Sequence, residues 1–204
     1  EKSNLFNAPE TYMNKISTNI SETNVVDLDF SVKKNINNLA EYKNKRPEDL
    51  TACILDRPRH KDIINELNNL GVKLKLITDG DVSGALLVTE EKYGVDIFLG
   101  VGGGPEGVLA ASALDAFDCN FQGRFIFESD KDKSRASNMR IKDFNKKYEL
   151  NEIISGDSIF CATGITTGDL VSGIKIENDE FLSETLITHK SQGLKKVMKI
   201  KQKI

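Results

Sequence analysis

The chain has 204 residues, which is enough for one sizeable α/β domain, or for one domain and part of another. Its 28 Lys and Arg residues nearly balance 31 Asp and Glu residues, and the net charge of -3 favours neither nucleic acid nor an anionic membrane as a partner. No apolar run approaches the roughly 20 residues of a membrane span. Three scattered cysteines without a CxxC pair (Cys53, Cys119 and Cys161) are typical of a reduced, intracellular protein. We therefore expect a soluble, cytoplasmic protein.

The two ends of the chain carry separate signals. The opening has neither a Met nor a capping or turn signal, so it predicts entry partway through a strand or loop of a longer protein. The basic tail at residues 195–203 alternates with apolar side chains. We interpret this tail as the solvated face of a strand or helix rather than as a nucleic-acid patch.

Residues 24–30 are expected to be extended, and Ser31 is predicted to cap an amphipathic helix with Ile36 and Leu39 on its apolar face. The elements expected next, in chain order, are a turn at 46–49, a strand at 51–55, a helix that ends at Gly71, a strand at 72–78, a short helix through Leu87, a strand at 95–99, a glycine-rich segment at 100–107, a helix at 108–117, a weak strand at 123–127, a solvated helix at 134–148, a strand at 158–162, and strands separated by turns from 173 onward.

This alternation of strands and helices predicts an α/β fold with a mainly parallel sheet flanked by helices. In such sheets, ligands bind at the carboxyl ends of the strands. The unusual motifs of this sequence follow directly after predicted strands. That coincidence predicts a site at one edge of the sheet.

The glycine-rich segment at 100–107 ends in Pro105, Glu106 and Gly107. Its glycines allow the backbone to approach a ligand, and Pro105 suits the first turn of the following helix, whose free N–H groups favour an anion. Since a carboxylate repels phosphate, Glu106 fits a phosphate site only with a divalent cation between the two groups. The alternative is a simple turn in which Glu106 interacts with the helix dipole.

Three other segments also follow predicted strands. Asp79, Gly80 and Asp81 suit metal or sugar hydroxyls, or simply a turn and a helix cap. Arg57, Pro58 and Arg59 present two guanidinium groups on a stiff turn, suited to phosphate. His60 is expected to cap a helix or face solvent, and His189 is expected to be isolated. The segment at 162–169 is expected to be a turn that could line the same edge.

Together these motifs resemble the class II (GlpX-type) fructose-1,6-bisphosphatases. The resemblance rests on five segments in register along nearly the whole chain: Asn-Ala-Pro-Glu-Thr-Tyr-Met at 7–13, Leu-Asp-Arg-Pro-Arg-His at 55–60, Asp-Gly-Asp-Val at 79–82, the Pro-Glu-Gly loop at 102–108, and Ala-Thr-Gly-Ile-Thr at 162–166. Two departures are Arg57, where the family also has Lys, and Gly104, where Ala is more usual. The former keeps the charge, and the latter slightly loosens the loop.

The resemblance implies the layered sugar-phosphatase fold shared with inositol monophosphatases. It also implies metal-dependent hydrolysis of fructose 1,6-bisphosphate to fructose 6-phosphate and phosphate in gluconeogenesis and carbohydrate metabolism, with Mn²⁺ or Mg²⁺, by a protein that tends to form homo-oligomers. By position, Glu106 would bind metal, and the residues that would contact substrate are Tyr12, Arg57, Pro58, Arg59, Asp79, Gly80, Asp81 and Gly103.

The resemblance also implies that the other metal ligands and the catalytic residues precede Glu1. Residues 1–30 are then a remnant of an N-terminal domain and 31–204 a C-terminal α/β domain, which could need a separate N-terminal half as partner. We expect little activity from this chain alone. Alternatives are a phosphatase for sedoheptulose 1,7-bisphosphate or an inositol phosphate, a sugar-phosphate-binding module without catalysis, and a glycine-rich α/β domain whose motifs are only turns.

Overall fold

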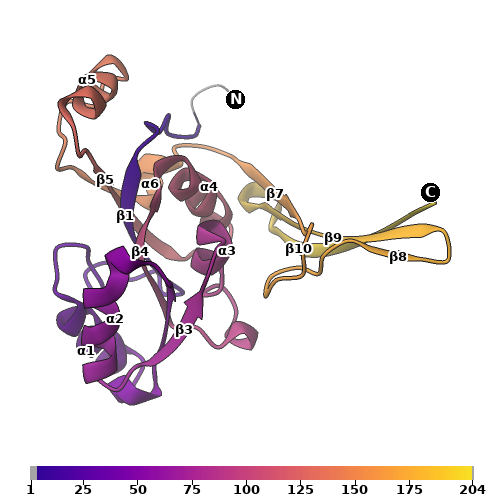
Figure 1. The fold of residues 1–204 in the computed structure, drawn as a ribbon, viewed down its shortest axis with the longest axis horizontal. Coiled ribbons are helices and arrows are strands. Elements are labelled where there is room, and N and C mark those ends of the chain that lie inside the picture. The colour runs from indigo at the N-terminus through magenta and orange to yellow at the C-terminus, as the bar shows by residue number, and fades with distance from the viewer. Residues whose placement is uncertain (1–3, 204) are drawn as a thin grey trace.

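The structure is a computed structural model that describes residues 4–203. The expectations for residues 1–3 and for Ile204 therefore lie outside the described residues. Two sheets are present within this range (Figure 1). Among the described residues, no helix is long and apolar enough to cross a bilayer.

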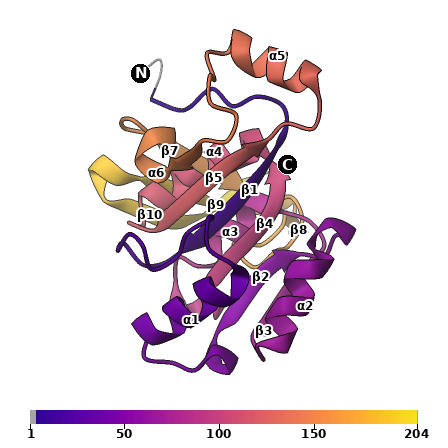
Figure 2. The same ribbon diagram turned by 90° about the vertical axis from the view of Figure 1, so that its left-hand side faces the viewer.

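The main sheet has six strands in the order β3-β2-β4-β1-β5-β6. Their bounds are β1 Tyr12–Thr18, β2 Thr51–Leu55, β3 Lys73–Ile77, β4 Ile97–Gly103, β5 Asn120–Ile126 and β6 Lys147–Glu149. Figure 2 shows β1 in the middle of this sheet, between β4 and β5. The α/β class with a sheet flanked by helices is confirmed.

The expected mainly parallel pairing needs correction. Only β3, β2 and β4 run parallel, because the connections through helices carry the chain back to the same sheet end. Strand β1 is antiparallel to both β4 and β5, and β6 is antiparallel to β5. The sheet is therefore mixed, and its parallel part carries the predicted motifs.

Helices cover both faces of the main sheet. The helices are α1 Val32–Tyr42, α2 Lys61–Asn69, α3 Asp81–Leu86, α4 Gly104–Asp115, α5 Asp130–Asn138 and α6 Leu150–Ile153. Helices α1 and α2 bury Ile36, Leu39 and Leu67 with Ile16 of β1 on one face. On the other face, α3, α4 and α6 pack against Met13 and Phe98. Side chains of successive strand residues enter opposite cores, as the pleat requires.

The predicted helix ends are confirmed at two places. The Ser31 hydroxyl accepts a hydrogen bond from the Lys34 amide at 3.1 Å and begins α1. Gly71, at φ 73°, follows α2 in the left-handed conformation that a residue without Cβ adopts readily.

A second sheet contains β7 Ile159–Thr163, β8 Lys175–Glu177, β9 Glu180–His189 and β10 Leu194–Lys203, all antiparallel. It extends to one side of the main sheet in Figure 1. The basic tail is thus a strand, as one of its two interpretations predicted. The turn between β8 and β9 is formed by Asn178 and Asp179, both with positive φ.

Three expected elements were wrong. Residues 24–30 form turns, because Asp27 accepts a hydrogen bond from the Asp29 amide and replaces strand pairing. The glycine-rich segment continues β4 through Gly103, because β1 pairs with it there. The expected helix at 134–148 begins earlier, after a capping box at Ser129, and is followed by β6.

The predicted domain boundary after residue 30 stays a prediction. In this structure, β1 precedes that boundary, and its pairing partners β4 and β5 follow it.

Candidate functional site at the carboxyl edge

The predicted motifs meet at one edge of the main sheet. Strands β2, β3 and β4 run parallel, and they are followed by the Arg57 turn, the Asp79 turn and the first turn of α4, respectively. The antiparallel β1 begins at the same edge, because Tyr12 pairs with Gly103. The end of β4, at Val101, Gly102 and Gly103, is where the side chains described below converge.

Arg59 is tied to β4 and to β1. Its Nε donates to the Val101 carbonyl oxygen at 2.9 Å, and its guanidinium carbon lies 5.1 Å from the centre of the Tyr12 ring. Such a cation over an aromatic face is attractive by about 0.5–1 kcal/mol at an exposed site. The side chain therefore has a defined place beside Tyr12 and still exposes guanidinium N–H groups to a ligand.

Asp81 begins α3 and forms an ion pair through Oδ2 with Lys15 Nζ in the middle of β1. The Lys15 side chain is 1% exposed and that of Asp81 is 12% exposed. Burial lowers the pKa of Lys15, while Asp81 next to it favours the charged form. A Cβ at Gly102 would lie 2.3 Å from Asp81 Oδ2, so the carboxylate rests directly against the β4 backbone.

Glu106 lies in the first turn of α4, and its carboxylate folds back over Gly103. A Cβ at Gly103 would be 1.8 Å from Glu106 Oε2, so only glycine leaves this position open to the carboxylate. Glu106 and Gly103 line a hollow of about 470 Å³ with Tyr12. Its other lining residues are Glu10, Thr11, Pro105, Glu128 and Asp132.

The other predicted residues lie at the same edge; they are Arg57, Pro58, Asp79 and Gly80. No side-chain contact among the described residues joins them to Arg59, Asp81 or Glu106. Asp79 Oδ1 accepts a hydrogen bond from the Gly80 amide, and Gly80 has φ 87°, so this segment is also a tight turn. Pro58 begins a short 3₁₀ helix, and Arg57 precedes it in an extended conformation.

His60 does occupy the N-cap position of α2, but its side chain makes no capping hydrogen bond, and it is fully buried rather than solvent-facing. Its Nδ1 lies 2.7 Å from the Leu55 carbonyl oxygen, and its Nε2 accepts from the Val101 amide at 2.8 Å. The Nδ1–H tautomer satisfies both contacts. Burial lowers the pKa of His60. The ring thus links the ends of β2 and β4 and fixes the edge on which the site lies.

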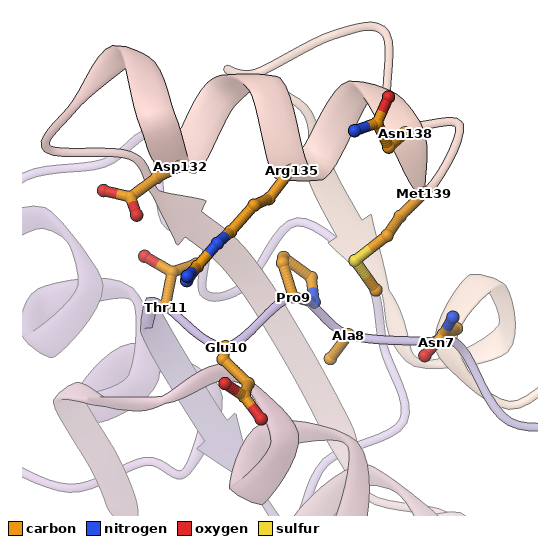
Figure 3. Close-up of a pocket in the computed structure, with 9 residues that line it drawn as sticks. All are labelled: Asn7, Ala8, Pro9, Glu10, Thr11, Asp132, Arg135, Asn138 and Met139. Atoms are coloured by element: carbon orange, nitrogen blue, oxygen red, sulfur yellow. The ribbon is translucent and has the colours of Figure 1, made fainter.

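A second hollow adjoins the first. Figure 3 shows Arg135 of α5 extending toward Thr11. The two residues line this second hollow, which has a volume of about 420 Å³. Glu10, Thr11 and Asp132 line both hollows. Helix α5 therefore forms one wall of the region next to Glu106.

Two further expectations concern the second sheet. The segment at 162–169 does not line the edge, since β7 joins the second sheet, and Asp169 pairs with Lys75 inside β3 at 2.9 Å. His189 is not isolated, because Asp157 Oδ2 lies 2.6 Å from its Nε2. Ser191 contacts this same ring nitrogen, so the three do not form a proton relay, which needs both nitrogens.

The sequence matches the protein family described as "Bacterial fructose-1,6-bisphosphatase, glpX-encoded" over residues 1–202. The chain belongs to this family. The expectation drawn from the five motifs is thereby confirmed.

Several relatives of this GlpX-type chain carry the name D-fructose 1,6-bisphosphatase class 2/sedoheptulose 1,7-bisphosphatase. The one from Synechococcus sp. (strain JA-3-3Ab) is 35% identical over 92% of this chain and 58% of its own length. The one from Prochlorococcus marinus (strain AS9601) is 35% identical over 90% and 59%, and that from Synechocystis sp. (strain ATCC 27184 / PCC 6803 / Kazusa) is 32% identical over 92% and 58%. The chain thus spans slightly less than three fifths of these relatives.

The carboxylates of the site provide only some of the ligands needed by the metal ion that the family implies. The Glu106 carboxylate makes no hydrogen bond or ion pair with residues 4–203, and hard cations prefer such oxygens. Asp81, by contrast, is neutralised by Lys15. Within the described range, no group of three or more His, Cys, Asp or Glu residues could hold a metal ion. The described residues therefore offer fewer than three ligands at any one place and do not complete a coordination shell.

Sequence reasoning missed Lys15 and the carboxylates at positions 10, 128 and 132. A signal for Lys15 did exist. It stands two residues after Met13 and two before Ser17, so strand alternation places it on the same buried face as both. A lysine on a buried strand face needs a carboxylate partner. For the other three carboxylates the sequence offers no comparable signal.

Proposed function

We propose that the protein to which this chain belongs is a sugar-bisphosphate phosphatase that hydrolyses fructose 1,6-bisphosphate to fructose 6-phosphate and phosphate. The observation that supports this most directly is the convergence of Arg59, Asp81 and Glu106 on three consecutive residues of β4, in a chain of the GlpX-type family. If these motifs were only turns, the convergence of the three side chains on β4 would have no explanation.

In this proposal each residue has a distinct role. Arg59, held beside Tyr12, faces a phosphate with its planar donors, and Arg57 supplies a second guanidinium. Asp79, Gly80 and Asp81 accept hydrogen bonds from sugar hydroxyls, and the Pro58 turn and Gly103 leave room for the substrate. The amides of the first turn of α4 favour an anion.

Mn²⁺ or Mg²⁺ is proposed as the cofactor, with Glu106 as one ligand. A bound divalent cation would neutralise phosphate charge and lower the pKa of a bound water. Because no group of three or more potential ligands exists among the described residues, the other ligands and the catalytic residues are proposed to come from another part of the protein.

Exchange of Glu106 tests this assignment. In the full-length protein, Glu106→Gln keeps the shape of the side chain and removes its charge, so the Mn²⁺ concentration needed for half-maximal phosphate release should rise by about tenfold or more. Asp179→Asn, in the distant β8–β9 turn, is the control and should leave that concentration unchanged. An unaltered metal requirement in Glu106→Gln would favour the reading of the motifs as turns.

A second candidate substrate is sedoheptulose 1,7-bisphosphate, because the relatives' names include it. A panel with both bisphosphates and an inositol phosphate separates the candidates by kcat/KM. Binding of fructose 1,6-bisphosphate without turnover by the full-length protein would instead indicate a sugar-phosphate-binding module.

Homo-oligomerisation, a role in gluconeogenesis and a cytoplasmic location also remain proposals. Reduced thiols agree with the proposed location, since Cys53, Cys119 and Cys161 are all free. Sedimentation of the purified full-length protein tests the oligomeric state.

A further inference from the structure

Lys15 is the least expected charged residue of the molecule. It lies in β1, the strand between β4 and β5, and its side chain is among the largest that are fully buried. An ammonium group loses its hydration in such a place and must be compensated by a carboxylate. Asp81 provides this compensation from the start of α3.

Glycines leave the space that the pair occupies. An added Cβ at Gly102 would lie 2.3 Å from Asp81 Oδ2, and one at Gly107 would lie 3.0 Å from Lys15 Cε. Any larger residue at Gly102 would displace the carboxylate. The Lys15–Asp81 pair is thus fitted into the same glycine-rich segment that carries Glu106.

The two oxygens of Asp81 have different surroundings. Oδ2 accepts the Lys15 ammonium, whereas Oδ1 is buried and has no hydrogen-bond partner among the described residues. A buried carboxylate oxygen without a donor is costly, so a polar group of a ligand is a natural partner for it. Asp81 lies against Gly102 and Lys15 lies next to Gly107, the residue after Glu106, so the pair belongs to the site.

We propose that Lys15 is a positioning residue for substrate: it holds Asp81 through Oδ2 and thereby keeps Oδ1 as the acceptor for a hydroxyl of the sugar bisphosphate. This inference rests on the proposed function, because it takes Asp81 to face the sugar. It adds to that function a residue that does not itself contact the substrate.

The test uses Lys15→Met, Asp81→Asn and the double variant in the full-length protein, with calorimetric binding of fructose 1,6-bisphosphate and, separately, of inorganic phosphate. Lys15→Met should weaken bisphosphate binding by about tenfold or more, the loss typical of a hydrogen bond to a charged group. Inorganic phosphate, which has no sugar hydroxyl, should bind each variant as tightly as it binds the unaltered protein.

The double variant decides whether Lys15 acts through Asp81. If it does, Lys15→Met combined with Asp81→Asn binds the bisphosphate as Asp81→Asn alone does. This comparison also serves if Lys15→Met by itself fails to fold, because the double variant leaves no buried charge unpaired. Additive losses would overturn the proposal.

Lys43→Met is the matched control. Lys43 forms a largely buried ion pair with Asp96, 2.9 Å long, just before β4 begins and hence at the opposite edge of the sheet. Its loss should lower stability and leave both ligands bound as before. Unchanged bisphosphate binding by Lys15→Met would overturn this inference and leave the proposed function intact. Failure of the unaltered protein to bind the bisphosphate would overturn the proposed function as well.

Discussion

The imidazole of His60 is a structural link between two strand ends, and its chemistry makes that link sensitive to pH. In the folded protein, Nε2 must remain an acceptor for the Val101 amide, so the neutral ring is required. Burial accordingly lowers the pKa of His60, while the unfolded chain retains the ordinary value.

We therefore expect acid to destabilise the fold through His60. Below its ordinary pKa the unfolded state binds a proton that folded His60 does not bind, so the contribution of His60 is fully present above that pKa and decreases as the pH falls. Between about pH 7.5 and pH 5.5, the unmodified protein should lose stability more steeply than His60→Asn, by up to about 1.4 kcal/mol per pH unit. Urea titrations at several pH values measure both slopes, and equal slopes would contradict the assignment.

Gly103 provides a second prediction for a single residue. Its φ of -62° suits alanine, but the added Cβ would lie 1.8 Å from Glu106 Oε2. Only the flexible end of one side chain must move, so Gly103→Ala should change the free energy of unfolding by less than about 1 kcal/mol. The metal requirement of phosphate release should nevertheless rise, because the Glu106 carboxylate is displaced.

A matched control exists for this change. A Cβ at Gly168 meets nothing within 4 Å, so Gly168→Ala should alter neither stability nor metal requirement. If Gly103→Ala behaves like Gly168→Ala in phosphate release, the position of Glu106 over Gly103 has no functional importance.

Among the elements, α1 shows how the core on its face of the main sheet is stabilised. Ile36 is fully buried, and the core that it joins is separated by the main sheet from the core beneath α4. Ile36→Ala removes buried methyl and methylene groups, so it should lower the free energy of unfolding by about 2–5 kcal/mol. Bisphosphate binding should stay unchanged wherever the protein is folded.

Asn37 is the neighbouring control. It is exposed on the same helix, and Asn37→Ala should change stability by less than about 0.5 kcal/mol. A similar, small effect of Ile36→Ala in urea titrations would mean that α1 is not packed as described.

Sequence patterns revealed the elements whose apolar residues follow a simple period. Strands β2 and β3 and helices α1 and α2 have apolar runs or faces bounded by Ser31, Pro58 or Gly71, and each was predicted close to its observed place. Strand β1 was missed, because three of its buried residues are Lys15, Ser17 and Thr18. Alternation with Met13 points to the buried face of Lys15, but the partners that make the burial of polar residues possible are distant in sequence, and no local pattern identifies them.

The candidate site likewise contains residues that local sequence patterns identify and residues that they do not. Arg59, Asp81 and Glu106 were predicted because each follows a strand within a motif of glycine or proline. Lys15 and Asp132 reach the site from β1 and α5, elements that were either missed or misplaced. Their roles depend on the pairing of the whole sheet.

For the whole molecule, the incomplete donor set leads to a prediction about activity. The 204-residue chain, assayed alone with Mn²⁺ and fructose 1,6-bisphosphate, should release phosphate at least about 100-fold more slowly than the full-length protein, since several kcal/mol of charge stabilisation by a bound cation are lacking. Comparable turnover by the two proteins would show that residues of this chain suffice for catalysis.

The central place of β1 has a consequence for biosynthesis. Its first residue pairs with Gly103 and Ile126, so both partner strands leave the ribosome long after β1 itself. At a synthesis rate of about 5–20 residues per second, both edges of β1 therefore remain without a pairing strand for several seconds. During that interval the cores that bury Met13 and Ile16 in the folded protein are incomplete. We expect a chaperone that binds short apolar segments to bind this strand.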